Sequence, residues 1–92
     1  MELDLKLSKK IVKDAIIKAT KGKHQINDET SLIGSSILDS VDLVEVCLLL
    51  EDESDKFGFQ FDWTSDSTLS KSQSIFRSVS SLAEEFLTQS GN

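Results

Sequence analysis

Ser40 is the residue of this sequence best placed to take part in chemistry, because it follows an aspartate and opens an acidic, helix-forming stretch. It lies within the motif Leu38-Asp39-Ser40-Val41-Asp42, and the motif Leu32-Ile33-Gly34 precedes it in the chain. A helix start offers unpaired backbone N–H groups and the positive end of the helix dipole, and both favour an attached anionic group. A serine at this place can also do no more than cap the helix. The position therefore suits either a modified hydroxyl or a structural cap.

The remaining residue types exclude most catalytic chemistry. The sequence has one cysteine, Cys47, and one histidine, His24, which excludes a disulfide framework, a structural zinc cluster and most histidine-based acid–base sites. A calcium loop beginning at Asp52 would require glycine at position 57 and glutamate at position 63, where the chain has phenylalanine and tryptophan. A serine hydrolase would require a Gly-x-Ser-x-Gly turn, which the sequence lacks. We therefore expect no catalytic residue, no metal site and no enzymatic activity.

Two regions of opposite charge divide the chain. The sequence has 92 residues and a net charge of −6, but residues 1–24 carry a net charge of +4 and residues 25–92 one of −10. Such an acidic body repels nucleic acid and attracts partners that have basic patches. No apolar run is long enough for a membrane span, and the first residues lack the apolar core of a secretory signal. We expect one cytoplasmic, monomeric domain over residues 1–92, with an ordered core over about residues 5–88.

Amphipathic spacing predicts a first helix over residues 8–20. Ser8 is its expected N-cap and Gly22 its expected stop. A long loop over residues 21–38 follows, and its apolar side chains indicate that it packs over the core. The apolar positions of the helix form one stripe: Leu7, Ile11, Val12, Ala15, Ile16 and Ala19.

A second helix is predicted to start at Asp39 or Ser40 and to run to about Asp55, with Asp39 as its N-cap. Val44, Cys47 and Leu48 recur at helical spacing and are expected to face the core. Seven acidic residues and no basic residue lie in this stretch. Acidic residues near the C-terminal end of a helix are not stabilised by its dipole, which indicates that the acidic face serves a partner.

The C-terminal part of the chain begins with an alternating aromatic segment, residues 57–63, which predicts extended backbone with one side on the core. Its aromatic rings either pack in that core or line a pocket for cargo. Residues 64–74 are rich in serine and threonine, with a short helical turn expected near Leu69. A last helix is predicted over residues 75–88, capped by Ser74 or a nearby serine. These elements indicate an all-α domain.

The Asp39-Ser40-Val41 sequence at the start of an acidic helix resembles the acyl carrier protein and peptidyl carrier protein family. The hallmark of that family is an Asp-Ser pair followed by an aliphatic residue where the second helix opens. The resemblance covers most of the chain: the first helix, the long loop, the second helix, the aromatic stretch and the last helix. It implies a small four-helix bundle with a long loop between helices 1 and 2.

The resemblance also implies a function. In the family, this serine is esterified by a 4′-phosphopantetheine arm whose thiol holds acyl or aminoacyl groups as thioesters. Ser40 would be the attachment site, flanked by Asp39 as helix N-cap. Val41, Asp42 and Glu45 would bind partners. The implied partners are a phosphopantetheinyl transferase, which uses coenzyme A, and acyl-loading and acyl-processing enzymes with basic patches; no nucleic acid and no membrane insertion are expected.

Two departures from the family pattern indicate a specialised carrier. Phe57, the first large residue after the second helix, lies about one helical turn farther from Ser40 than is usual in the family. The polar segment 62–74 stands where carriers of fatty acid synthesis have a compact acidic helix. We therefore expect a role in fatty acid-related, polyketide or other specialised biosynthesis. The alternative is an acidic helical adaptor that has the carrier fold and no attached arm.

Overall fold

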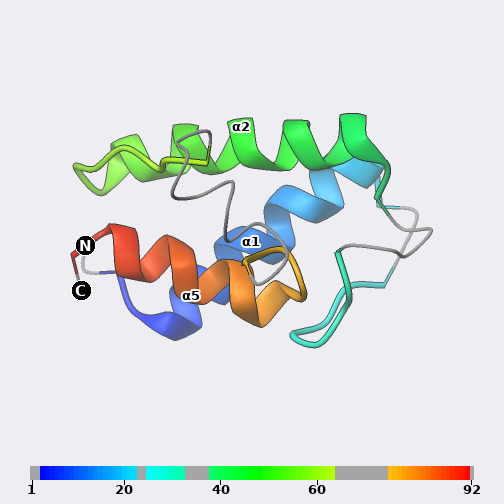
Figure 1. The fold of residues 1–92 in the computed structure, drawn as a ribbon, viewed down its shortest axis with the longest axis horizontal. Coiled ribbons are helices and arrows are strands. Elements are labelled where there is room, and N and C mark those ends of the chain that lie inside the picture. The colour runs from blue at the N-terminus through cyan, green and yellow to red at the C-terminus, as the bar shows by residue number, and fades with distance from the viewer. Residues whose placement is uncertain (1–2, 23–24, 33–37, 64–74, 92) are drawn as a thin grey trace.

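The computed structural model describes residues 3–22, 25–32, 38–63 and 75–91. Its described helices are α1 (Leu5–Thr20), α2 (Ser40–Lys56) and α5 (Val79–Gln89), and these four ranges contain no strand. α1 packs against both α2 and α5, and Figure 1 shows it running obliquely behind them. The predicted all-α class is confirmed for the described part of the chain. The helical turn expected near Leu69 lies outside it.

The start of α1 differs from the prediction. Asp4 is the N-cap, because its Oδ1 accepts a 2.8 Å hydrogen bond from the Leu7 N–H. Ser8 is fully buried, and its hydroxyl donates a 2.6 Å hydrogen bond to the carbonyl oxygen of Ala83 in α5. The prediction of Ser8 as the cap was wrong because this hydroxyl makes a tertiary contact that the local sequence does not reveal.

The end of α1 at Thr20 agrees with the predicted stop. Lys21 and Gly22 both have positive φ angles, of 58° and 73°. The Gly22 N–H donates a 2.9 Å hydrogen bond to the Ile17 carbonyl, which satisfies one of the last free carbonyls of the helix. Glycine adopts this left-handed backbone without a steric penalty, so Gly22 lets the chain leave the helix here.

α5 begins later than the predicted residue 75. Ser78 is its N-cap, and its hydroxyl oxygen accepts a 3.2 Å hydrogen bond from the Ser81 N–H. Ile75 and Phe76 are buried ahead of the helix. The apolar spacing runs through both segments without a break, so it could not locate the boundary between them.

The core lies between the three described helices. The predicted apolar stripe of α1 is confirmed, with Leu7 half-buried at its edge and the other members buried. Two connecting segments complete the core by inserting Leu32 and Phe61. The fully or almost fully buried apolar side chains are Val12, Ile16, Leu32, Val46, Cys47, Leu50, Phe61, Val79, Leu82, Ala83 and Phe86.

Candidate functional site

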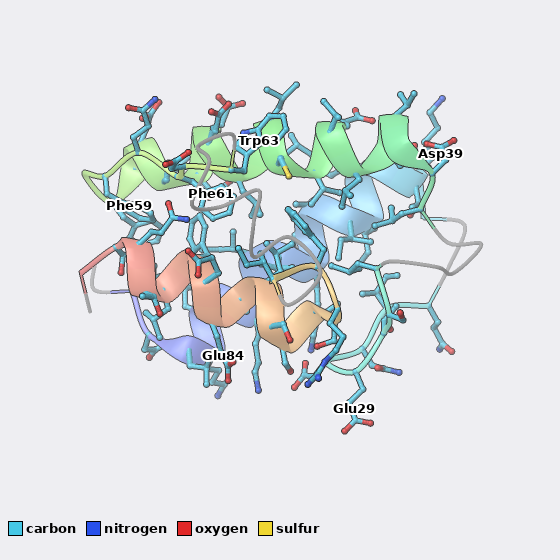
Figure 2. All side chains as sticks on the ribbon, viewed as in Figure 1. Glu29, Asp39, Phe59, Phe61, Trp63 and Glu84 are labelled. Atoms are coloured by element: carbon cyan, nitrogen blue, oxygen red, sulfur yellow. The ribbon has the colours of Figure 1, made fainter. Side chains whose placement is uncertain are left out.

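Asp39 fixes the residue at which α2 begins. Its Oδ1 accepts a 2.8 Å hydrogen bond from the Asp42 N–H, and its carbonyl oxygen accepts a 3.0 Å hydrogen bond from the Leu43 N–H. Ser40 is therefore the first residue of α2, and the predicted cap is confirmed. Figure 2 shows Asp39 at this end of the helix, on the outside of the molecule. The N–H groups of the first helical turn have no intrahelical acceptor, so this position suits an anionic group.

The residues that follow Ser40 form a surface that is both apolar and acidic. Val41, Val44 and Leu48 are 73%, 44% and 49% exposed. Glu45 and Asp52 are exposed beside them. These five residues lie along one side of the helix, which we call the outer face of α2. Exposed apolar side chains bordered by charged ones are typical of surfaces that bind another protein.

The expectation that Val44 and Leu48 face the core was wrong. Val46 and Leu50 are the fully buried residues of this stretch. With one exception, residues 43–50 are all apolar, so their spacing fits more than one side of a helix. Contact with α1 determines which side of α2 is buried, and that contact cannot be predicted from the sequence of α2 alone.

The residues predicted to bind partners lie on or next to the outer face of α2. Val41 and Glu45 belong to it, whereas Asp42 is half-buried at its border. Sequence reasoning missed Val44 and Leu48. Their signal was the spacing from Val41, because residues three and seven positions along a helix lie on the same side.

The segment 25–32 connects the approach to α2 with the start of α5. The carbonyl oxygens of Asp28 and Thr30 accept hydrogen bonds of 2.9 and 3.1 Å from the N–H groups of Ser80 and Val79. These bonds satisfy donors of the first turn of α5 that have no intrahelical acceptor. The segment is therefore held against the body of the protein by its backbone.

The side chain of Asp28 fastens the same segment to α1. Its carboxylate oxygens lie 2.5 Å from Lys13 Nζ and 3.4 Å from Lys9 Nζ. Chiefly through the hydrogen bond from Lys13, these lysines hold the pKa of the Asp28 carboxyl below its usual range. Leu32, at the end of this segment, and Leu38, at the start of the next described range, are both buried. Ile33 and Gly34 of the Leu32-Ile33-Gly34 motif lie outside the described residues.

Cys47 faces the core, as predicted. The side chain is 1% exposed, and burial raises the pKa of its thiol to about 12, with a further contribution from the charge of Glu51. A thiol reacts as its thiolate, so a buried and neutral thiol is inert at physiological pH. Cys47 therefore belongs to the packing of α2 and not to a reactive site.

The aromatic segment 57–63 packs on α5. The ring centroids of Phe59 and Phe61 lie 5.2 and 5.4 Å from that of Phe86. Phe57 and Trp63 are half-buried against the same core. These rings contribute to core packing, one of the two roles that their alternation predicts. The Trp63 Nε1–H is buried, and no described residue accepts a hydrogen bond from it.

Two polar side chains hold this aromatic segment in register. The Ser54 hydroxyl accepts a 3.0 Å hydrogen bond from the Phe61 N–H. The Gln89 amide pairs with the backbone of Asp62, accepting from its N–H at 2.6 Å and donating to its carbonyl at 2.8 Å. A side-chain amide here replaces the pairing that a neighbouring strand would supply.

Across the described ranges, no group of three or more histidine, cysteine, aspartate or glutamate residues is arranged to bind a metal ion. The described helices are too short or too polar to cross a membrane. Comparison with models of protein families, with curated proteins and with solved structures finds no match to this chain. The candidate site is thus defined by its own geometry: a helix that begins at Ser40, next to an exposed apolar and acidic face.

Proposed function

We propose that this chain is a carrier domain and that Ser40 is the attachment site of a 4′-phosphopantetheine arm. The observation on which this proposal depends is the cap at Asp39, which makes Ser40 the first residue of α2. The residues on both sides of it, Asp39 and Val41, are exposed to solvent. A modifying enzyme has to reach the serine from outside, so exposed neighbours support the assignment.

The helix start fits the group that would be attached. A phosphodiester is anionic, and the first turn of α2 offers N–H groups and the positive end of the helix dipole. The Asp39 carboxylate already accepts a hydrogen bond from the Asp42 N–H, which engages its charge at the cap. When bound, the arm supplies a thiol that holds an acyl or aminoacyl group as a thioester. The chain itself displays the arm and needs no catalytic side chain for this task.

The outer face of α2 supports a role in docking the enzymes that load and process the cargo. Val41 and Leu48 offer apolar contact area, and Glu45 and Asp52 offer negative charge beside it. Opposite charge on a partner accelerates encounter, and apolar contacts at the centre of an interface supply most of the affinity. We propose partners with basic patches, including a phosphopantetheinyl transferase, in fatty acid-related, polyketide or other specialised biosynthesis.

The proposal includes the four-helix bundle of carriers for the complete chain. Ile75 supports it, because this buried residue has helical backbone and is separated from α5 by residues 76–78. Backbone assignments from NMR over residues 64–74 would test this part of the proposal.

The attachment site can be tested by mass spectrometry of the intact protein. Wild-type protein incubated with coenzyme A and a broad-range phosphopantetheinyl transferase should gain the mass of one phosphopantetheine. Ser40→Ala should gain nothing, whereas Ser80→Ala, which removes a hydroxyl from the first turn of α5, should be modified like the wild type. Absence of a mass gain in the wild type would instead favour an acidic helical adaptor without an attached arm.

The docking face can be tested through the rate of the same reaction. Raising the salt concentration from about 0.05 to about 0.5 M should slow the modification, because salt screens exposed charges. Glu45→Gln should be slower than the wild type at low salt and should differ less from it at high salt. Rates that do not respond to salt or to this substitution would remove Glu45 from the docking face.

A further inference from the structure

α1 presents a second charged surface on the side that points away from the core. Lys6, Lys10 and Ile17 are exposed there, and Lys13 is half-buried. We call these four residues the outer face of α1. They line a hollow on the molecular surface, with Asp28 at its border. This face therefore combines positive charge with an exposed apolar side chain.

Part of the positive charge on this face is not engaged within the described structure. Lys13 is paired with Asp28, at 2.5 Å. Lys6 and Lys10 form no ion pair with any residue that the structure describes. Two unpaired ammonium groups beside Ile17, which is 41% exposed, complement a surface that is acidic and apolar.

The outer faces of α1 and α2 have the same spacing. Positions 6, 10, 13 and 17 and positions 41, 45, 48 and 52 are both separated by intervals of four, three and four residues. Each set spans about 17 Å of helix. If the two helices lie antiparallel, apolar residues face each other at one position, opposite charges face each other at two positions, and Lys10 lies with its apolar stem against Leu48 at the remaining one. The facing pairs are Ile17–Val41, Lys13–Glu45, Lys10–Leu48 and Lys6–Asp52.

These two faces cannot meet within one molecule. α1 and α2 already pack together through their buried sides, which contain Val12 and Ile16 on α1 and Val46 and Leu50 on α2. The outer faces lie opposite to these buried sides and point away from each other. We propose that the outer face of α1 binds the outer face of α2 of a second copy of this chain, with the two helices antiparallel.

The charge distribution favours a protein surface over an anionic membrane as the occupant. Asp4, Asp14 and Asp28 line the same hollow as the lysines, and residues 25–92 carry a net charge of −10. A flat anionic membrane laid on this hollow would contact these three carboxylates together with the lysines, whereas a single helix can align its charges with individual lysines. At physiological ionic strength, charges farther apart than about 8 Å are largely screened, so the facing pairs outweigh the net repulsion between copies.

The contact is head-to-tail, because each copy contributes a different face, and it does not close into a symmetric dimer. One helix face is smaller than the interfaces of stable complexes, so the dissociation constant should lie at about 0.1–1 mM. The protein is then monomeric when dilute and associates when concentrated. Association covers Val41 and Leu48 and hides the outer face of α2 from other partners. The contact does not involve Ser40 and forms whether or not an arm is attached there.

Sedimentation velocity over a range of protein concentrations tests this proposal. The wild type should show a sedimentation coefficient that rises with concentration, and raising NaCl from about 0.05 to about 0.5 M should weaken the association at least threefold, as a rough estimate. Lys6→Gln/Lys10→Gln should abolish the rise, and so should Glu45→Gln/Asp52→Asn. The control Lys18→Gln/Lys21→Gln removes two exposed lysines outside the face and should behave like the wild type.

A mixture of the two double variants distinguishes head-to-tail binding from other arrangements. The lysine variant keeps its α2 face and the acidic variant keeps its α1 face, so together they should form a heterodimer of limited size. A wild type that stays monomeric at every concentration, a lysine variant that still associates, or a mixture that stays monomeric would each overturn the proposal. Binding of wild type but not of Lys6→Gln/Lys10→Gln to phosphatidylserine vesicles would also overturn it and would assign the face to membranes.

Discussion

The hydroxyl of Ser8 donates a 2.6 Å hydrogen bond to the carbonyl oxygen of Ala83, across 75 positions of the sequence. Both residues are fully buried. Because the donor belongs to α1 and the acceptor to α5, the bond fixes how these two helices are aligned.

Replacing Ser8 with alanine should lower the free energy of unfolding by about 1–2 kcal/mol, because a buried hydrogen bond is lost. Urea denaturation followed by circular dichroism would measure the change. Ser80→Ala is the matched control. This serine is half-buried in α5, the helix that contains Ala83, and its hydroxyl makes no hydrogen bond to a described residue. Equal midpoints for both variants would contradict a structural role of the Ser8 hydroxyl.

Leu48 and Leu50 should respond very differently to truncation, although they are only two residues apart. Leu50 is fully buried, so Leu50→Ala should cost about 2–5 kcal/mol of unfolding free energy. Leu48 is 49% exposed, so Leu48→Ala should cost about 1 kcal/mol or less. A lower urea midpoint for Leu48→Ala than for Leu50→Ala would mean that Leu48, and not Leu50, lies on the buried side of α2.

The cap of α2 can be separated from the charge of Asp39. Asp39→Ala removes the acceptor for the Asp42 N–H and should destabilise the protein by about 1 kcal/mol. Asp39→Asn keeps an oxygen that accepts the same bond and should retain most of the stability. Thermal unfolding of the two variants measures the difference. A loss as large in the asparagine variant as in the alanine variant would show that the negative charge, and not the hydrogen bond, stabilises this helix start.

The ion pairs of Asp28 should make stability depend on pH in acid solution. Lys13 and Lys9 hold the pKa of Asp28 below its ordinary value of 3.8, so the folded state favours the ionised carboxyl. The contribution of Asp28 is therefore present above pH 3.8 and is lost as the pH falls through the lowered pKa of the folded state. The melting temperature of the wild type should exceed that of Asp28→Asn near neutral pH, and the difference should shrink in acid.

A neighbouring carboxyl provides the control for this pH dependence. Glu29 is exposed and forms no ion pair with a described residue, so Glu29→Gln should follow the wild type at every pH. If the wild type and Asp28→Asn keep the same difference in melting temperature down to about pH 2, the ion pairs do not contribute to stability.

The two helix starts show what local sequence can and cannot predict. Asp39 caps α2 through a residue three positions away, so the bond is encoded in a short stretch and could be predicted. At α1 both Asp4 and Ser8 are good capping residues, and the choice depends on Ala83, which lies far along the chain. Tertiary contacts of this kind override local preference.

The residues of the candidate site also fall into two groups, those that local sequence could assign and those that depend on a tertiary contact. Asp39, Val41 and Glu45 could be assigned from their distance to Ser40, because a helix start is a local feature. Val44 and Leu48 were misassigned to the core although their spacing from Val41 places them on its side, because almost every residue around them is apolar and contact with α1 determines the buried side. Segments with little polar contrast are therefore the places where spacing alone misassigns a face.

The bidentate contact between Gln89 and Asp62 also constrains the order of events during synthesis. Residues 57–63 leave the ribosome before α5 does, and neither the Gln89 amide nor the Phe86 ring is then available to them. The Ser8 hydroxyl likewise cannot form its hydrogen bond to the Ala83 carbonyl before α5 is available. The nascent chain can form α1 and α2 early, but its aromatic segment cannot reach its final position until α5 has also left the ribosome.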